Sequence, residues 1–388
     1  MSGSRIAVFL VVVLGVLGSL HYYLWVRLVR DAHLATPLDT LATAVIVLLF
    51  ALLLVAVPAS RLLPKSASTP IIWAAFTWLG FAFFLVVLVL SADVVRIAAV
   101  VGRIAFEKPP IEPERRLFLS RALAGAIAVV ALLLGLSGLR EGLKRVHVKK
   151  IRISLRRIRP TRVGYRIVQL SDLHVGPTIG RDFVQDVVAQ TNGLNPDLIV
   201  ITGDLVDGSV EKLADAVAPL ADLKAKDGVY FVTGNHEYYS GVDEWLAHLA
   251  TLGIRALRNE RVSIGASDGF DLAGIDDYTG HGYPGHGPNL ARALAGRDRG
   301  RVLILLAHQP KQVFEAAQTD VDLQLSGHTH GGQMFPFNFL VRLQQPYVSG
   351  FHMHEGTGIY VSNGTGYWGP PMRVGTQAEI TQIELRMS

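Results

Sequence analysis

The sequence predicts two joined parts, an N-terminal bundle of four membrane-spanning helices and a C-terminal α/β domain. Three observations lead to this prediction. Half of the 388 residues are apolar, and the long apolar runs all fall within the first 140 residues. From Tyr165 onward, short apolar runs alternate with stretches of helical spacing. Several of these short runs end in polar turn residues, as strands do at the ligand-binding edge of an open α/β sheet.

Four apolar runs predict the membrane part, which we assign to residues 1–140. Each has the length and hydropathy that a helix needs to cross the hydrocarbon core. The first follows Arg5 and ends in aromatic and basic residues, as expected at a membrane surface. Four such runs favour a membrane domain over buried helices of a soluble protein or a signal peptide. The runs are Ile6–Val26, Leu41–Ala59, Ile71–Leu90 and Ala122–Leu139.

Charges near these runs predict an anchor. His21, Asp93 and Arg96 fall near the predicted helix ends, whereas a transport pathway places ionisable groups inside the bilayer. Nine Lys or Arg residues between Arg140 and Arg159 favour the cytoplasmic side for everything downstream, although the preceding loop is also basic. We expect a multi-pass protein of the inner or plasma membrane. The charges favour the cytoplasmic side for its C-terminal domain without deciding it.

Residues 141–162 have two interpretations. Their basic side chains could lie on anionic lipid headgroups as a linker, so membrane lipids are one expected partner. The partial alternation from Val146 to Leu155 is instead typical of a solvated first strand.

Residues 163–388 form the predicted α/β domain, and most elements follow from local pattern. Helical spacing predicts helices over Phe183–Gln190, Val210–Leu223 and Val242–Leu252, and Gly265–Gly287 is expected to be loops around one strand near Phe270–Ala273. The other predicted strands are Arg166–Leu170, Asp197–Ile201, Val229–Val232, Val302–Leu306, Val321–Leu325, Gly358–Val361 and Ala378–Leu385.

Metal-binding residue types follow five of these strands by a few positions. The chain has no cysteine, so any metal must be held by oxygen and imidazole ligands. Glycines beside these residues let the backbone turn sharply and approach a ligand. One such residue would be unremarkable, but five strands delivering them to one edge predict a site for divalent cations. The residues are Asp172 and His174, then Asp204, then Asn235 and His236, then His308, and finally His328 and His330.

These short blocks together resemble the signature motifs of the calcineurin-like metallophosphoesterases, over roughly residues 163–385, and look most like the bacterial membrane-associated branch. The blocks are Asp172-Leu-His174, Gly203-Asp204, Gly234-Asn235-His236-Glu237, His308 and Gly327-His328-Thr-His330. The resemblance implies a four-layer α/β/β/α sandwich of two mixed sheets. Gln377-Ala378 stands where that branch usually has two prolines, outside the set of ligands.

The resemblance also implies roles for these residues and two divalent ions of manganese, iron or zinc. Asp204 would bridge the ions, and a hydroxide between them would attack the phosphorus. His236 would bind no metal and would face the phosphate as a proton donor or transition-state stabiliser. One ion would be held by Asp172, His174 and His330, and the other by Asn235, His308 and His328.

The implied activity is hydrolysis of a phosphomonoester or phosphodiester, and the substrate is left open. An apolar stretch after the last ligands, containing Phe335, Phe337, Phe339 and Leu340, would suit a lipid-linked substrate or simply pack in the core. The alternatives are a soluble nucleotide substrate, with the helices as a tether, or a catalytically silent metal-binding sensor or scaffold. No nucleic-acid partner is expected, and the sequence identifies no substrate-binding residue.

Other polar residues are weaker candidates for the site. Asp276 and Asp277 could support the ligands or the substrate because they follow a predicted strand. Loop histidines in glycine-rich segments are usually solvated, which applies to His281, His286, His352 and His354.

Overall fold

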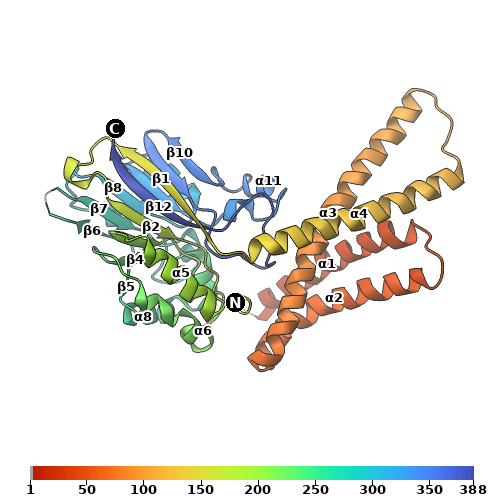
Figure 1. Cartoon of the computed structure of the whole chain (residues 1–388), viewed down its shortest axis with the longest axis horizontal. Coiled ribbons are helices and arrows are strands. Elements are labelled where there is room, and N and C mark those ends of the chain that lie inside the picture. The colour runs from red at the N-terminus through yellow and green to blue at the C-terminus, as the bar shows by residue number, and fades with distance from the viewer. Residues whose placement is uncertain (1–2, 267) are drawn as a thin grey trace. The chain divides into compact units, whose positions relative to one another are not determined.

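The structure, a computed structural model, describes residues 3–266 and 268–388. It divides into two compact units (Figure 1). The first comprises residues 1–140 with the short segment 369–372, and the second comprises residues 141–368 and 373–388.

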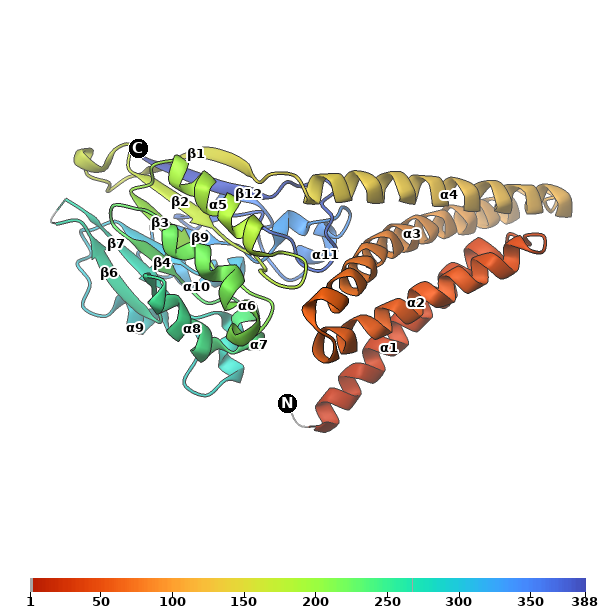
Figure 2. The same ribbon diagram turned by 60° about the horizontal axis from the view of Figure 1, so that its bottom comes forward.

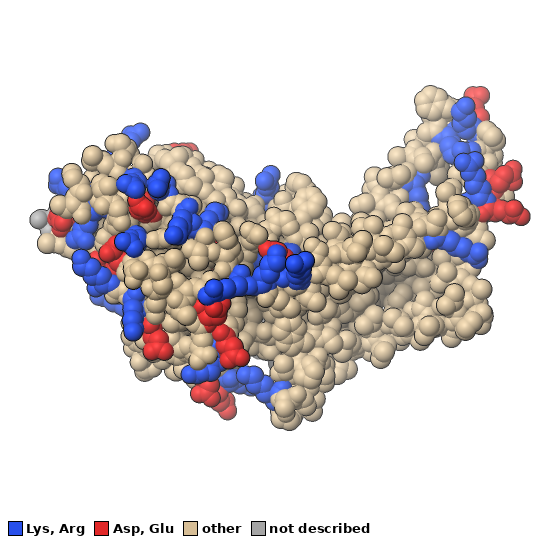
Figure 3. Space-filling model, in the orientation of Figure 1, with Lys and Arg blue, Asp and Glu red and all other residues tan. Residues whose placement is uncertain are grey.

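The first unit is helical, and four of its helices are long and apolar enough to cross a membrane, as the sequence predicts. Few of their apolar side chains are buried, which suits contact with lipid. On the face shown in Figure 3, charged side chains are sparse on these helices and gather where α3 meets α4. The helices are α1 (Gly3–Trp25), continued by the π-helix η1 (Val26–Arg30), α2 (Leu38–Leu62), α3 (Lys65–Ala105) and α4 (Pro113–Gly142).

The third helix is longer than its apolar run predicts. It continues beyond Leu90 to Ala105, so Asp93 and Arg96 lie inside α3 and not just past its end. Asp93 pairs with Arg96 one turn later and with Arg27 of η1, 2.9 Å away. This pairing lets the helix carry a carboxylate among apolar residues without leaving it uncompensated.

Two six-stranded mixed sheets form the second unit, as the sequence resemblance implies. In the first, β2 to β5 are parallel, and β12 joins β2 antiparallel and β1 parallel. Its order is β1 (His147–Leu155), β12 (Glu379–Met387), β2 (Arg166–Leu170), β3 (Leu198–Ile201), β4 (Val229–Phe231), β5 (Ile254–Ala256).

The second sheet is parallel from β7 through β8 and β9 to β11, with antiparallel strands at both edges. Its order is β10 (Gly350–His354), β11 (Thr357–Val361), β9 (Leu323–Ser326), β8 (Leu303–Leu306), β7 (Phe270–Gly274), β6 (Glu260–Ile264).

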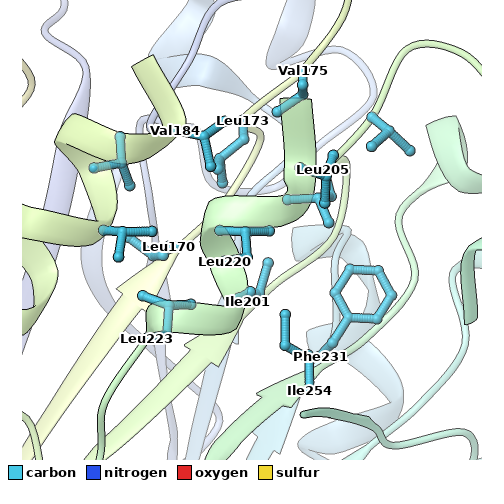
Figure 4. Close-up of a cluster of buried hydrophobic side chains, with 14 of the residues drawn as sticks. Leu170, Leu173, Val175, Val184, Ile201, Leu205, Leu220, Leu223, Phe231 and Ile254 are labelled. Atoms are coloured by element: carbon cyan, nitrogen blue, oxygen red, sulfur yellow. The ribbon is translucent and has the colours of Figure 1, made fainter. Parts of the chain in front are cut away.

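Helices cover the outer faces of the two sheets, giving four layers. The helices α5 (Arg181–Gly193), α6 (Val210–Val217) and α8 (Val242–Thr251) pack on the first sheet (Figure 2). Figure 4 shows this contact, where Leu170, Ile201 and Phe231 of the strands face helix residues such as Val184 and Leu220. On the second sheet, α9 (Leu290–Leu294) and α10 (Val313–Ala316) do the same.

Residues on the opposite faces of the strands form a core between the sheets. Leu198 and Val200 of β3 face Ile304, Leu306 and other residues of the second sheet, whereas their neighbours face the helices. The strands are therefore buried on both faces, which explains why they read as continuous apolar runs.

The basic run of residues 141–162 contains an edge strand, β1, as one of its two interpretations expects. Other elements differ from the prediction. Helix α6 ends at Val217, because Pro219 breaks the predicted helix and a 3₁₀ turn, η3 (Ala218–Asp222), follows. The short strands β5, β6 and β10 were not predicted, since edge strands show little apolar pattern.

Candidate metal centre

The predicted site residues all lie just after strands, in a turn or at the start of the short helix that follows. Asp172 and His174 follow β2, and Asp204 follows β3. Asn235 and His236 begin α7 (Asn235–Ser240), directly after β4. The remaining three are His308 after β8, His328 after β9, and His330 at the start of the 3₁₀ turn η6 (His330–Gly332). Because the two sheets pack face to face, these turns meet across the sandwich.

One group of ligand atoms is formed by Asp172, His174 and His330. The Nε2 atoms of His174 and His330 are 3.0 Å apart, and Nε2 of His330 lies 3.6 Å from Asp172 Oδ1. These are the three side chains that the sequence resemblance assigns to one ion.

A second group surrounds His308. Its Nε2 lies 3.2 Å from Asp204 Oδ2, 3.2 Å from Asn235 Oδ1 and 3.2 Å from His328 Nδ1. Asp204 also reaches the first group, since its Oδ2 lies 3.8 Å from Nε2 of His174. The structure thus brings all seven predicted ligands into one cluster, with Asp204 between its two halves.

The backbone of this cluster is unusual, because five of the seven residues have positive φ. The left-handed conformation costs free energy for residues other than glycine, and such costs concentrate at functional sites. In this site, the left-handed conformation lets side chains that are close together in one turn, such as Asp172 and His174, both reach the cluster. The five are Asp172 (φ 52°), His174 (50°), Asp204 (51°), His328 (72°) and His330 (51°).

The chemistry of the cluster fits cations. Asp172 Oδ2 is buried and has no hydrogen-bond partner, although Oδ1 accepts from the His328 amide. Burial, together with the charge of His308, lowers the pKa of His328 to about 3. Burial and the charges of His174 and Arg373 hold the pKa of His330 well below its usual value. Two neutral imidazoles and a buried carboxylate oxygen without a partner are groups that a divalent metal would satisfy.

Burial alone would raise the pKa of the Asp204 carboxyl, but the charges of His308, His236 and His174 outweigh it and lower that pKa well below its usual range. For Asp172 the outcome is opposite, since burial and the Asp204 charge raise its pKa. The same two carboxylates raise the pKa of His308 against the effect of burial. Such mutual dependence is expected where charged groups lie close together and are shielded from water.

His236 lies at the rim of the cluster, and the structure gives it a partner that the sequence did not reveal. Its Nδ1 is 2.5 Å from Asp207 Oδ1, which is also 3.1 Å from Nδ1 of His174. Burial lowers the pKa of His236, but Asp207 and Asp204 outweigh that effect and raise it to about 9. The two imidazoles in turn hold the Asp207 pKa below its usual value against burial. In the sequence, the only sign that Asp207 belongs to the site is that it follows Asp204 by three residues.

Glu237 joins two of the turns. Its buried carboxylate accepts hydrogen bonds from the backbone amides of Asp204, Leu205 and Gly234, at 3.0, 2.7 and 2.6 Å. Burial and the nearby Asp204 charge raise its pKa to about 7. Glu237 therefore fixes the turn after β3 to the turn after β4 and is not itself a ligand.

Of the weaker candidates for the site, only Asp277 forms a hydrogen bond to a turn that carries a predicted ligand. Asp277 is buried and accepts two hydrogen bonds from the side chain of Gln309, the residue after His308, so it supports a ligand turn. Asp276 pairs with Arg258. The four histidines that were expected in loops all contact groups outside the cluster: His281 contacts Tyr278, and His286 contacts Arg258. His352 and His354 lie in the edge strand β10 and not in a loop, and both contact Tyr347.

Comparisons of this chain with known proteins all point to the same family. The sequence profile described as calcineurin-like phosphoesterase matches residues 165–332. A protein of Bos taurus named "Transmembrane protein with metallophosphoesterase domain" is 43% identical over 289 residues, covering 71% of this chain and 64% of that protein. One of Danio rerio with the same name is 41% identical over 270 residues, covering 67% and 62%.

An "Uncharacterized metallophosphoesterase" of Helicobacter pylori strain J99 is 40% identical over 281 residues, which cover 72% of this chain and 74% of that protein. The chain spans less than two thirds of the length of the two animal relatives. The names of those two proteins combine a transmembrane part with a metallophosphoesterase domain, as this chain combines its two units.

Proposed function

The chain belongs to the calcineurin-like metallophosphoesterases, and from that membership we propose that it is a membrane-anchored enzyme that hydrolyses a phosphate ester. The observation that carries the proposal is the single cluster of seven ligand side chains with His236 at its rim. A silent scaffold has no need for a histidine held in place beside the ligands.

Two ions would be divided among these side chains as the geometry groups them. Asp172, His174 and His330 would hold one ion. His308, His328 and Asn235 would hold the other, and Asp204 would be shared. When bound, a pair of divalent ions would neutralise charge on the phosphoryl oxygens and make a water molecule acidic enough to act as the nucleophile.

His236 would exchange a proton with the leaving oxygen. Its backbone amide donates to Asp204 Oδ1 at 2.9 Å, which fixes the residue against the shared ligand. Because Asp207 occupies Nδ1, Nε2 is the atom left to face a substrate. Asp207 orients both His236 and the ligand His174, so it couples the acid to the metal site.

The proposal predicts metal-dependent turnover by the full chain purified in detergent. Stripping with chelator should lower hydrolysis of chromogenic phosphate mono- and diesters at least 100-fold, and manganese should restore it. Asp204→Asn should lose bound metal and turnover together, because it removes the shared carboxylate. Asp215→Asn, which changes an exposed carboxylate of α6, is the matched control and should keep both.

Full turnover in Asp204→Asn would refute the bridging role. A wild-type protein that binds two ions but cleaves no ester would support the scaffold alternative instead.

One observation favours a lipid-linked substrate. Directly after the ligand turn, the segment around α11 (Asn338–Val341) exposes large apolar side chains, including Phe335 (54% exposed), Phe339 (55%) and Leu343 (81%). Exposed apolar surface beside a catalytic site suits a substrate with hydrocarbon chains, in a chain whose helices place it at a bilayer. Comparing detergent-solubilised lipid phosphate esters with nucleotides tests this, and higher kcat/KM for nucleotides would favour the soluble alternative.

A further inference from the structure

Two exposed aromatic rings flank His236. Tyr239 is 64% exposed and Trp368 is 52% exposed. Their ring centroids lie 5.4 and 5.9 Å from that of His236, and both meet it edge to face, at 67° and 76°. Large aromatic side chains left this exposed beside a catalytic histidine are available to contact a bound molecule.

The backbone of Trp368 is bonded to the side chain of Gln333, in the turn that carries the predicted ligand His330. The side-chain amide of Gln333 donates to the Trp368 carbonyl at 2.9 Å, and its oxygen accepts from the Trp368 backbone amide at 3.0 Å. Gln333 follows the ligand His330 by three residues and has a positive φ of 49°. Its double hydrogen bond therefore holds the tryptophan at a set position relative to the metal site.

Tyr239 belongs to α7, the short helix that begins with the predicted ligand Asn235. It lies one helical turn after Asn235 in α7, so the backbone of this short helix sets its position relative to Asn235. Both rings are thus attached to turns that carry predicted ligands, although neither ring belongs to the cluster.

The position of His236 decides what these rings would contact. Its side chain is 16% exposed, whereas those of His174, His308 and His330 are 8% exposed or less. Asn235 and His328 are also partly exposed, so the cluster is open to solvent where these two residues and His236 lie, and a substrate would enter there. The oxygen that receives the proton belongs to the leaving alcohol, so the carbon atoms of that alcohol lie next to His236 and within reach of the two rings.

Building on the proposed function, we propose that Tyr239 and Trp368 form the binding site of the leaving alcohol and that they select an apolar one, with a hydrocarbon chain or an aromatic ring. Aromatic faces reward burial of apolar groups and offer few hydrogen bonds to a strongly hydrated alcohol. The two residues are specificity determinants for the same reaction.

The test compares leaving groups of similar acidity on the metal-loaded full chain in detergent. Methyl, hexyl and 2-phenylethyl phosphate, or the corresponding ethyl diesters if wild type cleaves only diesters, are assayed by release of the product. The readout is the ratio of kcat/KM for each apolar ester to kcat/KM for the methyl ester. Loss of the preference for hexyl alone or for 2-phenylethyl alone identifies the chain or the ring as the natural group.

We expect Trp368→Ala and Tyr239→Ala each to lower this ratio about tenfold, mainly through KM. Trp368→Phe should restore most of it. Tyr239→Phe should do the same because it keeps the ring and removes only the hydroxyl. The matched control is Phe314→Ala, which removes a half-exposed aromatic ring of α10 and should leave the ratio unchanged.

A ratio unchanged within twofold in both alanine variants would overturn the inference, as would an equal loss on all three esters, which indicates a role in positioning His236. Failure of wild type to cleave any of the esters would contradict the proposed function itself, so the two failures are distinguishable.

Discussion

Asp207 shows how one side chain can organise several others. One of its oxygens lies within hydrogen-bond distance of both His174 and His236, a predicted ligand and the predicted acid. A carboxylate that holds Nδ1 of a histidine fixes both the tautomer and the ring orientation, leaving Nε2 for a metal or a substrate.

We therefore predict that Asp207→Asn lowers kcat by 10- to 100-fold and weakens metal binding about tenfold, because both imidazoles lose a charged acceptor. Steady-state kinetics across manganese concentrations separate the two effects. Asp222→Asn, an exposed change before β4, serves as the comparison. Wild-type kinetics in Asp207→Asn would show that the contact has no role in turnover.

At the scale of elements, the site depends on turns that pass very close to one another. Gly327 begins the turn after β9, and a Cβ atom placed there would overlap Ser171 Oγ and Asp172 Oδ2. Gly234 is similar, since its Cβ would overlap Asp204. These glycines are required for close approach of backbone to ligand side chains and not for an unusual φ.

The consequence is a prediction for Gly327→Ala. The added methyl group should displace Asp172, so bound metal and turnover should both fall at least tenfold while the far-ultraviolet circular dichroism stays that of wild type. Metal analysis of the purified variant is the direct measurement. Gly180→Ala should behave as wild type, because nothing lies within 4 Å of a Cβ at that position. Full metal content in Gly327→Ala would mean that the turn can shift freely.

At the scale of the whole molecule, four apolar helices precede an α/β domain. This domain carries the site at the carboxyl ends of the parallel strands of its two sheets. The basic residues after the last helix favour the cytoplasmic side for this domain. Since the chain has no cysteine, single introduced cysteines report sidedness without background.

We predict that a membrane-impermeant maleimide labels Glu112→Cys in intact cells or spheroplasts, whereas Arg299→Cys is labelled only after permeabilisation. Glu112 lies between α3 and α4, and Arg299 is an exposed residue of the α/β unit. One of the four helices that are long and apolar enough to cross a membrane, α4, lies between these two sites, so we expect them to face opposite sides. The reverse labelling pattern would place the catalytic unit outside.

The sequence by itself predicted the four long apolar helices, the central strands and the polar residues that follow those strands, because these depend on local properties. Length and hydropathy define a span, strands buried on both faces read as apolar runs, and the polar residues come directly after them. Edge strands such as β6 and β10 escaped prediction because their exposed positions carry little pattern.

Only the tertiary structure decided which residues meet. Asp207 reaches His236 across two different turns, and Gln333 attaches Trp368, far along the chain, to the metal turn. These pairs depend on the order of strands in the sheets and on the packing of one sheet against the other. Because no local periodicity encodes that order, the supporting contacts of the site emerge only when the chain is folded.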